Sequence, residues 1–339
     1  MKKAHIITLF LTLLIAVLGI SCESSYNFRI PEKTKDGWQT ASLDDVGIKK
    51  KSLSELIKRI GRKEYQNIHS LLIVKDGKLV LEEYFDGYQW DPEYDQFRGE
   101  FTKFNRDTKH NIMSVAKAFT SALLGIAIDH GFIQSVDEKV YSFFPEYTYL
   151  KNEKKDNITL EHLLTMTSGF RWNEWDVSIS EERNDIRQLL IASDPIKYIL
   201  EKPVINQPGT YWYYSGGDVT LLGEVIREAT NLRIDDFAEQ YLFQPLGIEE
   251  YRWGFFKADV IHASGDLHLR PRDMAKFGYL ILNNGVWNNG RIISEKWIEK
   301  TTSEYIAIPN RAWEGERFGY QWWLKTYTAD SGTVEAIVR

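Results

Sequence analysis

The chain has 339 residues, of which 43% are hydrophobic and 27% are charged, as is ordinary for a soluble globular protein. This length suffices for one large domain or two of average size. A formal net charge of −6 excludes a general nucleic-acid binder, which needs a basic face, and also a polybasic membrane patch.

Residues 1–22 have the pattern of an export signal. Lys2 and Lys3 precede a mostly apolar stretch that is too short for a comfortable membrane span. Cys22 is the only cysteine and follows small residues, as in a bacterial lipobox, although Gly19 stands where leucine is usual. We therefore expect an exported, periplasmic or cell-surface protein with a lipid anchor at Cys22. The alternative is an ordinary cleaved signal with an incidental cysteine.

Residues 23–37 are mostly polar and show no periodicity, which predicts a tether ahead of a single domain over 38–339. Apolar residues at helical spacing predict a first helix over 52–60. The mature domain has no second cysteine, so its core has to hold without a disulfide.

Two apolar runs, 70–74 and 78–84, flank Asp76-Gly77, and Asp-Gly between such runs predicts a β-hairpin. Residues 87–110 are polar and aromatic without a clear period, and we expect a loop there.

Helical periodicity dominates the middle of the chain. It is strongest over 114–130, where Gly131 can end the helix. Further helices are expected at 159–166, 186–200, 219–230, 234–241 and 271–283. Alternating apolar residues at 320–324 and 327–338, interrupted at 330–332, predict terminal strands joined by a hairpin turn. These elements predict an α/β (α+β) fold, in which an antiparallel sheet formed from both chain ends receives an inserted, mostly helical subdomain.

Ser114 and Lys117 carry the clearest chemical signal. Residues three apart share a helix face, so the serine hydroxyl and the lysine amine can meet within hydrogen-bond reach. Serine is a poor nucleophile until a base takes its proton, and burial favours the neutral amine that can act as this base. The start of a helix also offers backbone N–H groups to an oxyanion. The tetrapeptide alone is a weak signal, because exposed pairs of this kind are common.

Four segments together are more specific: HNIMSVAKA at 110–118, ITLEHLLTMTSG at 158–169, PGTYWYYSG at 208–216 and RPRDMAKFG at 270–278. In order and spacing they resemble the β-lactamase-related serine hydrolases, a family of class C β-lactamases, penicillin-binding-protein-like proteins, 6-aminohexanoate-dimer hydrolases and esterases. The resemblance runs from about residue 38 to the last residue.

The resemblance implies an acyl-enzyme mechanism without a cofactor, acting on a small-molecule ester, amide or peptide. It assigns Ser114 as nucleophile, Lys117 as its base and Tyr214 as the tyrosine that exchanges protons with the leaving group. The neighbouring Tyr213 competes with Tyr214 for this role. His162 lies within a helical pattern, and we expect it to be structural.

Two departures from the family pattern narrow the function. Gly216 stands where the class C enzymes have asparagine, which favours the wider esterase and amidase group over the antibiotic hydrolases. The family's third element, a Lys-Thr-Gly, His-x-Gly or Gly-Gly strand, has no convincing counterpart here, since 330–332 better fits a turn. The pattern therefore predicts a chain truncated at its C-terminal end. A non-catalytic penicillin-binding-like or cell-wall-sensing module and a D-Ala-D-Ala peptidase remain alternatives.

The evidence for a functional role is weaker for the other candidate residues. No metal-ligand spacing is present, and His262 and His268 lack a surrounding carboxylate or thiolate pattern. Trp172, Trp175 and Trp212 could line a cleft, but we expect each of them to be a core residue.

Overall fold

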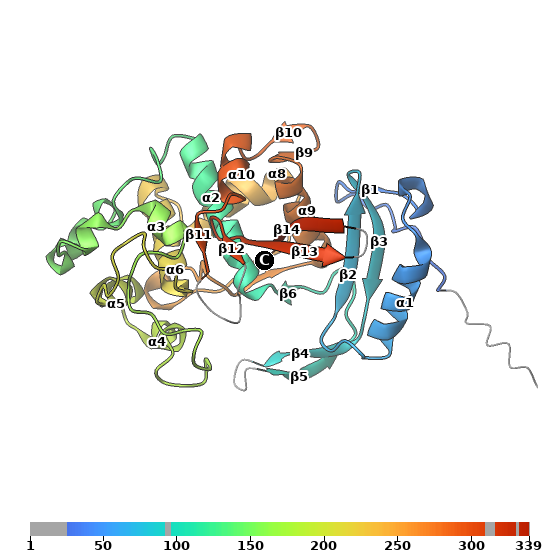
Figure 1. The fold of residues 1–339 in the computed structure, drawn as a ribbon, viewed down its shortest axis with the longest axis horizontal. Coiled ribbons are helices and arrows are strands. Elements are labelled where there is room, and N and C mark those ends of the chain that lie inside the picture. Colours follow the sequence, from blue (N-terminus) through green and yellow to red (C-terminus); the bar gives the residue numbers. More distant parts are fainter. Residues whose placement is uncertain (1–25, 92–95, 309–315, 330–331, 339) are drawn as a thin grey trace, which may run out of the picture.

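The computed structural model describes residues 26–91, 96–308, 316–329 and 332–338. The signal sequence and Cys22 lie outside these residues. A small sheet with one helix forms one end of the molecule and a group of helices the other, with α2 (Ala116–Asp129) between them (Figure 1). No helix in the described ranges is long and apolar enough to cross a membrane.

The first sheet contains β1 (Gln39–Thr40), β2 (Ser70–Lys75) and β3 (Lys78–Tyr84) in the order β1-β3-β2, and α1 (Lys50–Gly61) accompanies it. Strands β2 and β3 are antiparallel, and Asp76 and Gly77 connect them with φ angles of 51° and 72°. Positive φ at both central residues is what a two-residue hairpin turn requires. The predicted hairpin and first helix are confirmed.

The expected loop at 87–110 is wrong over most of its length. The segment contains the antiparallel strands β4 (Gly87–Asp91) and β5 (Gln96–Thr102). Most side chains of this hairpin are exposed or half-buried on both faces. Because neither face is buried, the sequence lacks the apolar alternation from which a strand is predicted.

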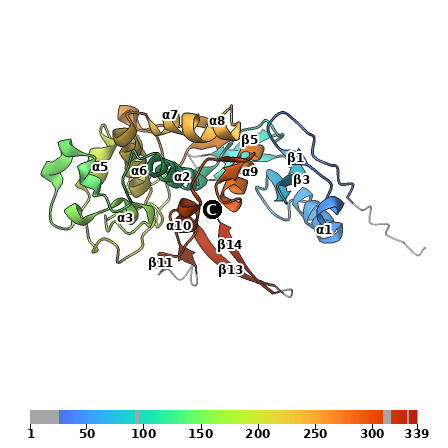
Figure 2. The same cartoon turned by 90° about the horizontal axis from the view of Figure 1, so that it is seen from above.

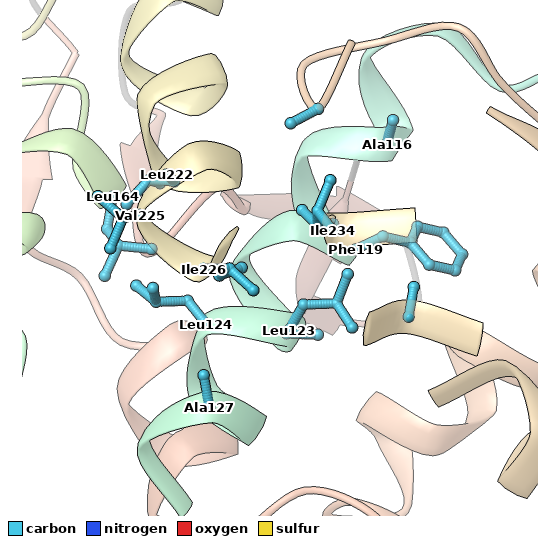
Figure 3. Packing of buried hydrophobic residues seen from close by; sticks show 14 of the residues in the cluster. Ala116, Phe119, Leu123, Leu124, Ala127, Leu164, Leu222, Val225, Ile226 and Ile234 are labelled. Atoms are coloured by element: carbon cyan, nitrogen blue, oxygen red, sulfur yellow. The ribbon is translucent and has the colours of Figure 1, made fainter. Parts of the chain in front are cut away.

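Helix α2 is the central element of the core. Its first 12 residues are all buried, and it packs closely against α6 (Gly216–Thr230), as Figure 3 shows. Phe119 stacks on Phe277 with 3.7 Å between ring centroids. A Cβ atom at Gly125 would lie 2.4 Å from the Trp297 ring, so only glycine allows this close approach.

The other helices agree with the predicted pattern except at one break and at two helices that were not predicted, over residues 244–246 and 295–301. They are α3 (Leu160–Leu164), α4 (Asp185–Ile191), α5 (Pro195–Glu201), α7 (Ile234–Ala238), α8 (Gln244–Leu246), α9 (Pro271–Leu282) and α10 (Glu295–Thr301). The single helix expected over 186–200 is two, because Asp194 caps the second helix and Pro195 occupies its first position. A π-helical turn, Glu239–Phe243, joins α7 to α8.

The remaining strands form three small sheets. They are β6 (His110–Asn111), β8 (Leu267–Leu269) and β7 (Arg252–Trp253); β9 (Val286–Trp287) and β10 (Gly290–Arg291); and β11 (Ile306–Ala307), β12 (Arg317–Phe318), β13 (Trp323–Ala329) and β14 (Gly332–Val338). The first of these lays the segment before Ser114 beside the segment that follows Ser264.

The α/β class, with antiparallel sheets and an inserted helical region, is confirmed. The expectation of one sheet built from both chain ends is not met within the described residues. Strands β2 and β3 belong to one sheet, and β13 and β14 to another. Figure 2 shows the β13–β14 hairpin projecting away from the first sheet. Alternating apolar residues indicate a strand but do not specify its partner.

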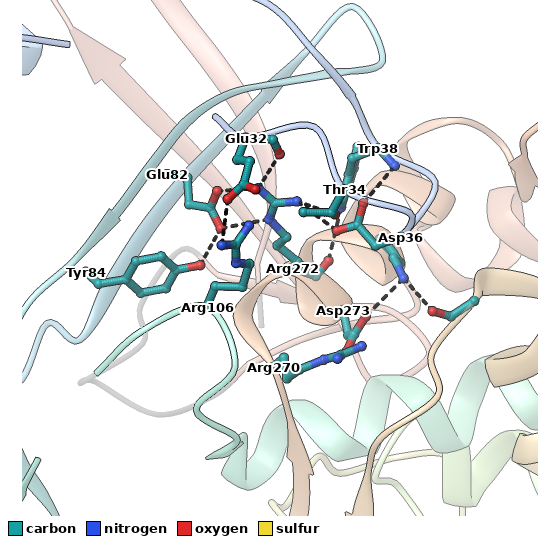
Figure 4. Close-up of polar contacts among 12 residues, drawn as sticks. Glu32, Thr34, Asp36, Trp38, Glu82, Tyr84, Arg106, Arg270, Arg272 and Asp273 are labelled. Carbon is teal, nitrogen blue, oxygen red and sulfur yellow. Dashed lines mark hydrogen bonds and ion pairs between the residues drawn. The ribbon is translucent and has the colours of Figure 1, made fainter. Parts of the chain in front are cut away.

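The predicted tether is partly packed on the domain (Figure 4). Arg272 is 3% exposed and donates hydrogen bonds to Thr34 Oγ1, Asp36 Oδ2 and the Glu32 carbonyl, as well as to both carboxylate oxygens of Glu82. These five bonds use all five guanidinium donors. Arg272 therefore joins residues 32–36 to β3 and α9, a linkage that the polar composition of 23–37 did not reveal.

Candidate active site

Ser114 lies in a tight turn, Met113–Val115, between β6 and α2. Met113 has a φ of 50°, a left-handed conformation that is uncommon for a residue with a side chain. Asn111 Oδ1 accepts a 2.9 Å hydrogen bond from the Met113 N–H and so supports this turn. Backbone strain of this kind is concentrated at functional sites.

Lys117, one turn further, directs its amine at the serine. Its Nζ atom lies 3.1 Å from Ser114 Oγ and 2.7 Å from the backbone carbonyl oxygen of Ser264. The residue is only 1% exposed. The predicted approach of the two side chains at i and i+3 is therefore present, and a second segment holds the amine in place.

Tyr214 approaches the serine from the other side. Its hydroxyl donates a 2.6 Å hydrogen bond to Ser114 Oγ, and Lys117 Nζ lies 4.8 Å from the centroid of its ring. The competing Tyr213 donates instead to Asp176 Oδ2 at 2.7 Å. The structure thus brings Ser114, Lys117 and Tyr214 together and points Tyr213 to a different partner.

Glu174 belongs to the same site and was not found from the sequence. Its Oε1 atom lies 3.9 Å from Lys117 Nζ, while Oε2 accepts hydrogen bonds from Trp172 Nε1 at 2.8 Å and the Gly216 N–H at 2.5 Å. The only signal in the sequence was indirect, namely the glycine at position 216 in place of asparagine.

His262 is adjacent to the lysine but lacks the properties of a base. Burial, together with the smaller effect of the positive charge on Lys117, lowers the pKa of His262 to about 4. His268 lies apart from the serine, in a polar cluster with Asp266, Asn111 and Arg252. Among the residues that the structure describes, no group of three or more side chains could hold a metal ion.

His162 caps a helix. Its ring Nδ1 atom accepts a hydrogen bond from the backbone N–H of Thr159, and the backbone N–H of His162 donates to Thr159 Oγ1. The two bonds form a reciprocal capping box at the start of α3. This agrees with the structural role expected for it.

A cavity of about 1230 Å³ opens at the serine. Apolar and aromatic side chains make up much of its wall: Ile68, Trp90, Phe97, Phe104, Trp175, Val177, Ile179, Ile186 and Leu190. Trp172 and Trp212 are core residues as expected, but Trp175 is 45% exposed and lines the cavity, so its assignment to the core is wrong. A tryptophan on a loop gives no period from which its exposure could be inferred.

Residues 330–332, the weak candidate for the family's third sequence element, lie mostly outside the described residues. Asp330 and Ser331 lie outside the described residues, and Gly332 begins β14 opposite Ala329. The flanking strands agree with the predicted hairpin turn.

Comparisons with known proteins agree on one family. The family model described as Beta-lactamase matches residues 69–337. Penicillin-binding protein 4* of Bacillus subtilis is 23% identical over 318 residues, which cover 82% of this chain and 64% of the relative. The 6-aminohexanoate-dimer hydrolase of Paenarthrobacter ureafaciens is 25% identical over 211 residues, covering 58% of this chain and 51% of the relative.

Solved structures show the same fold. A Bacillus anthracis protein provisionally assigned as a 6-aminohexanoate-dimer hydrolase superposes with a TM-score of 0.64 at 23% identity, covering 89% of this chain and 77% of that one. The octameric penicillin-binding protein homologue from Pyrococcus abyssi gives 0.58 at 20% identity, covering 80% and 64%. The chain thus spans less than two thirds of the length of the two curated relatives.

Proposed function

The chain belongs to the beta-lactamase family, and from this premise we propose that it is a serine hydrolase that forms an acyl-enzyme on Ser114. The supporting observation is the position of Ser114 Oγ between Lys117 Nζ at 3.1 Å and the Tyr214 hydroxyl at 2.6 Å. A nucleophile within hydrogen-bond reach of a base and of a second proton carrier is what acyl transfer requires.

The reaction proceeds in two balanced steps. Ser114 Oγ attacks the carbonyl carbon of an ester or amide, and its proton passes to the neutral amine of Lys117. Tyr214 donates a proton to the departing alcohol or amine, which leaves Ser114 acylated, and Tyr214 is reprotonated from Lys117. Water then attacks the acyl-enzyme along the reverse proton route and releases the acid. No cofactor takes part in these steps.

The cavity wall favours a substrate that carries an apolar group. Trp90 and Phe97 come from the β4–β5 hairpin and Leu190 from α4, so three separate segments present apolar side chains to the same space. We infer that the substrate is a small ester or amide rather than a nucleic acid.

A fluorophosphonate probe, which reacts with activated serines, tests the nucleophile. We expect labelling of the wild-type protein at Ser114 and none of Ser114→Ala, with peptide mass spectrometry locating the adduct. Equal labelling of the variant, or an adduct on another residue, would overturn the assignment.

Assays with three substrates or ligands separate the alternatives. Turnover of p-nitrophenyl esters without release of D-alanine from a D-Ala-D-Ala peptide supports the esterase or amidase function. Release of D-alanine supports a peptidase. A protein that binds a fluorescent penicillin without any turnover is a non-catalytic sensor.

We further propose that the protein is exported and lipid-anchored at Cys22. The support is the sequence of residues 1–22, a short basic region followed by a mostly apolar stretch and the single cysteine.

A further inference from the structure

Glu174 is the one carboxylate in the described ranges that lies in ion-pair distance of Lys117, with 3.9 Å between Oε1 and Nζ. The lysine side chain is 2% exposed and the glutamate side chain 14%. Attraction between charges is much stronger at such a site than in bulk water.

The carboxylate is held firmly by its other oxygen. Oε2 accepts from the Gly216 N–H at 2.5 Å and from Trp172 Nε1 at 2.8 Å. The buried Asn184 fixes the backbone by donating from Nδ2 to the carbonyls of Glu174 and Val177, at 3.2 and 3.0 Å. Oε1 is therefore aimed at the lysine by contacts that do not involve the lysine.

Gly216 leaves the room that Glu174 occupies. A Cβ atom at position 216 would lie 2.8 Å from Glu174 Oε2 and 2.6 Å from Ile186 Cδ1. Real Cβ atoms do not approach other atoms so closely, so a side chain here would displace the carboxylate. Glycine at position 216 therefore leaves the space in which the Glu174 carboxylate accepts the backbone N–H of this residue.

Other groups face the lysine from each element packed on it. Tyr214 presents its ring, Ser264 its carbonyl, and His262 lies close enough for its pKa to be lowered by the lysine charge after the larger effect of burial. The charge of Asp266 raises the pKa of His262 against these two effects, and the charge of Glu174 adds to the raised pKa of the buried Asp218.

We propose that Glu174 is a positioning residue that holds Lys117 toward Ser114 and stabilises the ammonium formed when Lys117 takes the serine proton. This inference rests on the proposed function. The carboxylate stabilises the charged form of the base, as the aspartate of a Ser-His-Asp triad stabilises the imidazolium.

Removing the charge has a signature that a packing defect lacks. Glu174→Gln keeps an acceptor for Gly216 and Trp172 but takes the negative charge away from Lys117. The acid limb of the pH–rate profile should move to lower pH by about 1–2 units, because protonated lysine loses its partner. The high-pH plateau should fall about tenfold, because a base that binds its proton less tightly is a weaker catalyst.

Two further variants serve as controls. Glu174→Asp keeps the charge and should keep the acid limb close to its wild-type position. Glu181→Gln makes the same chemical change on the same loop, where Glu181 pairs with the exposed Arg183, and should leave the profile unchanged.

The measurements are the rate of fluorophosphonate labelling against pH and, independently, an NMR titration of protein carrying 13Cε-labelled lysine. Lys117→Arg identifies the Lys117 signal. A downward displacement of both midpoints in Glu174→Gln supports the proposal. Unchanged midpoints overturn it even if activity is lost. Wild-type protein that is not labelled at Ser114 refutes the proposed function alone, because the NMR titration still reports the pairing of Glu174 with Lys117.

Discussion

Replacement of Arg272 by methionine should strongly destabilise the fold without touching the cavity. Methionine retains much of the apolar stem but removes five hydrogen bonds, and the side chains of Glu82 and Asp36 are only 8% and 17% exposed. Breaking a buried ion pair from one side typically costs about 3–5 kcal/mol, since a charge remains buried without its partner. We therefore expect the melting temperature to fall by on the order of 10 °C.

Two comparisons make this prediction specific. The double variant Glu82→Gln/Arg272→Met no longer leaves the Glu82 charge uncompensated and should recover part of the loss. Arg106→Ala removes only a pair with Glu32, whose side chains are 34% and 70% exposed, and such a pair contributes about 1 kcal/mol at most.

The pH dependence provides an independent check. Burial opposes ionisation of Asp36, but hydrogen bonds from Arg272 and Thr34 outweigh it and hold the pKa of this carboxyl below its usual value. The resulting stability is present above the unfolded-state pKa and is lost as the pH falls through the lower, folded-state pKa. The wild type should thus approach Arg272→Met in strong acid.

Thermal melts followed by circular dichroism from pH 2 to 8 measure both effects. If Arg272→Met melted within about 2 °C of the wild type at pH 7, the buried network would not be an anchor for residues 32–36, and the argument from burial would fail.

Four further predictions follow from the site and its surroundings. Lys117→Ala should lower turnover of an activated ester by ~10²–10⁴-fold, the usual cost of a lost base, and wild-type turnover would make this lysine merely structural. Tyr214→Phe should slow the reaction about a hundredfold while Tyr213→Phe has little effect; the reverse order would exchange their roles. Burial raises the pKa of Asp218 to about 7, so its contribution to stability is complete below the unfolded-state pKa and is lost as the pH rises through 7. Asp218→Asn should accordingly melt higher than the wild type at pH 8 but not at pH 4, and parallel melting curves would contradict this. Cys22→Ser should move the protein from the membrane to the soluble fraction, whereas unchanged fractionation would mean that no lipid is attached.

Structural features that depend on interactions within a few residues could be predicted from the sequence. Asp76-Gly77 fixes its own turn through positive φ angles, and the position of α2 in the chain follows from its apolar residues. The contact of Ser114 with Lys117 follows from helix geometry, because residues three positions apart lie on the same face of a helix.

Features that depend on contacts between residues far apart in the sequence were harder to predict. The β4–β5 hairpin escaped prediction because neither of its faces is buried, and Trp175 because a loop has no period. The packing of residues 32–36 also escaped, because its main partner, Arg272, lies more than 230 positions away along the chain.

The sequence by itself thus determined most of the helices, the first hairpin and the Ser114–Lys117 pair, while the resemblance favoured Tyr214 and left Tyr213 as a competitor. The tertiary structure alone decided that Tyr214 rather than Tyr213 meets the serine, and that Glu174 faces Lys117 in the space left by Gly216. The physical reason is range. Hydrogen bonds and steric contacts within one helical turn depend only on residues that are close in the sequence. The position of Glu174, 57 residues from Lys117, depends instead on how Asn184, Trp172 and Gly216 pack around its carboxylate.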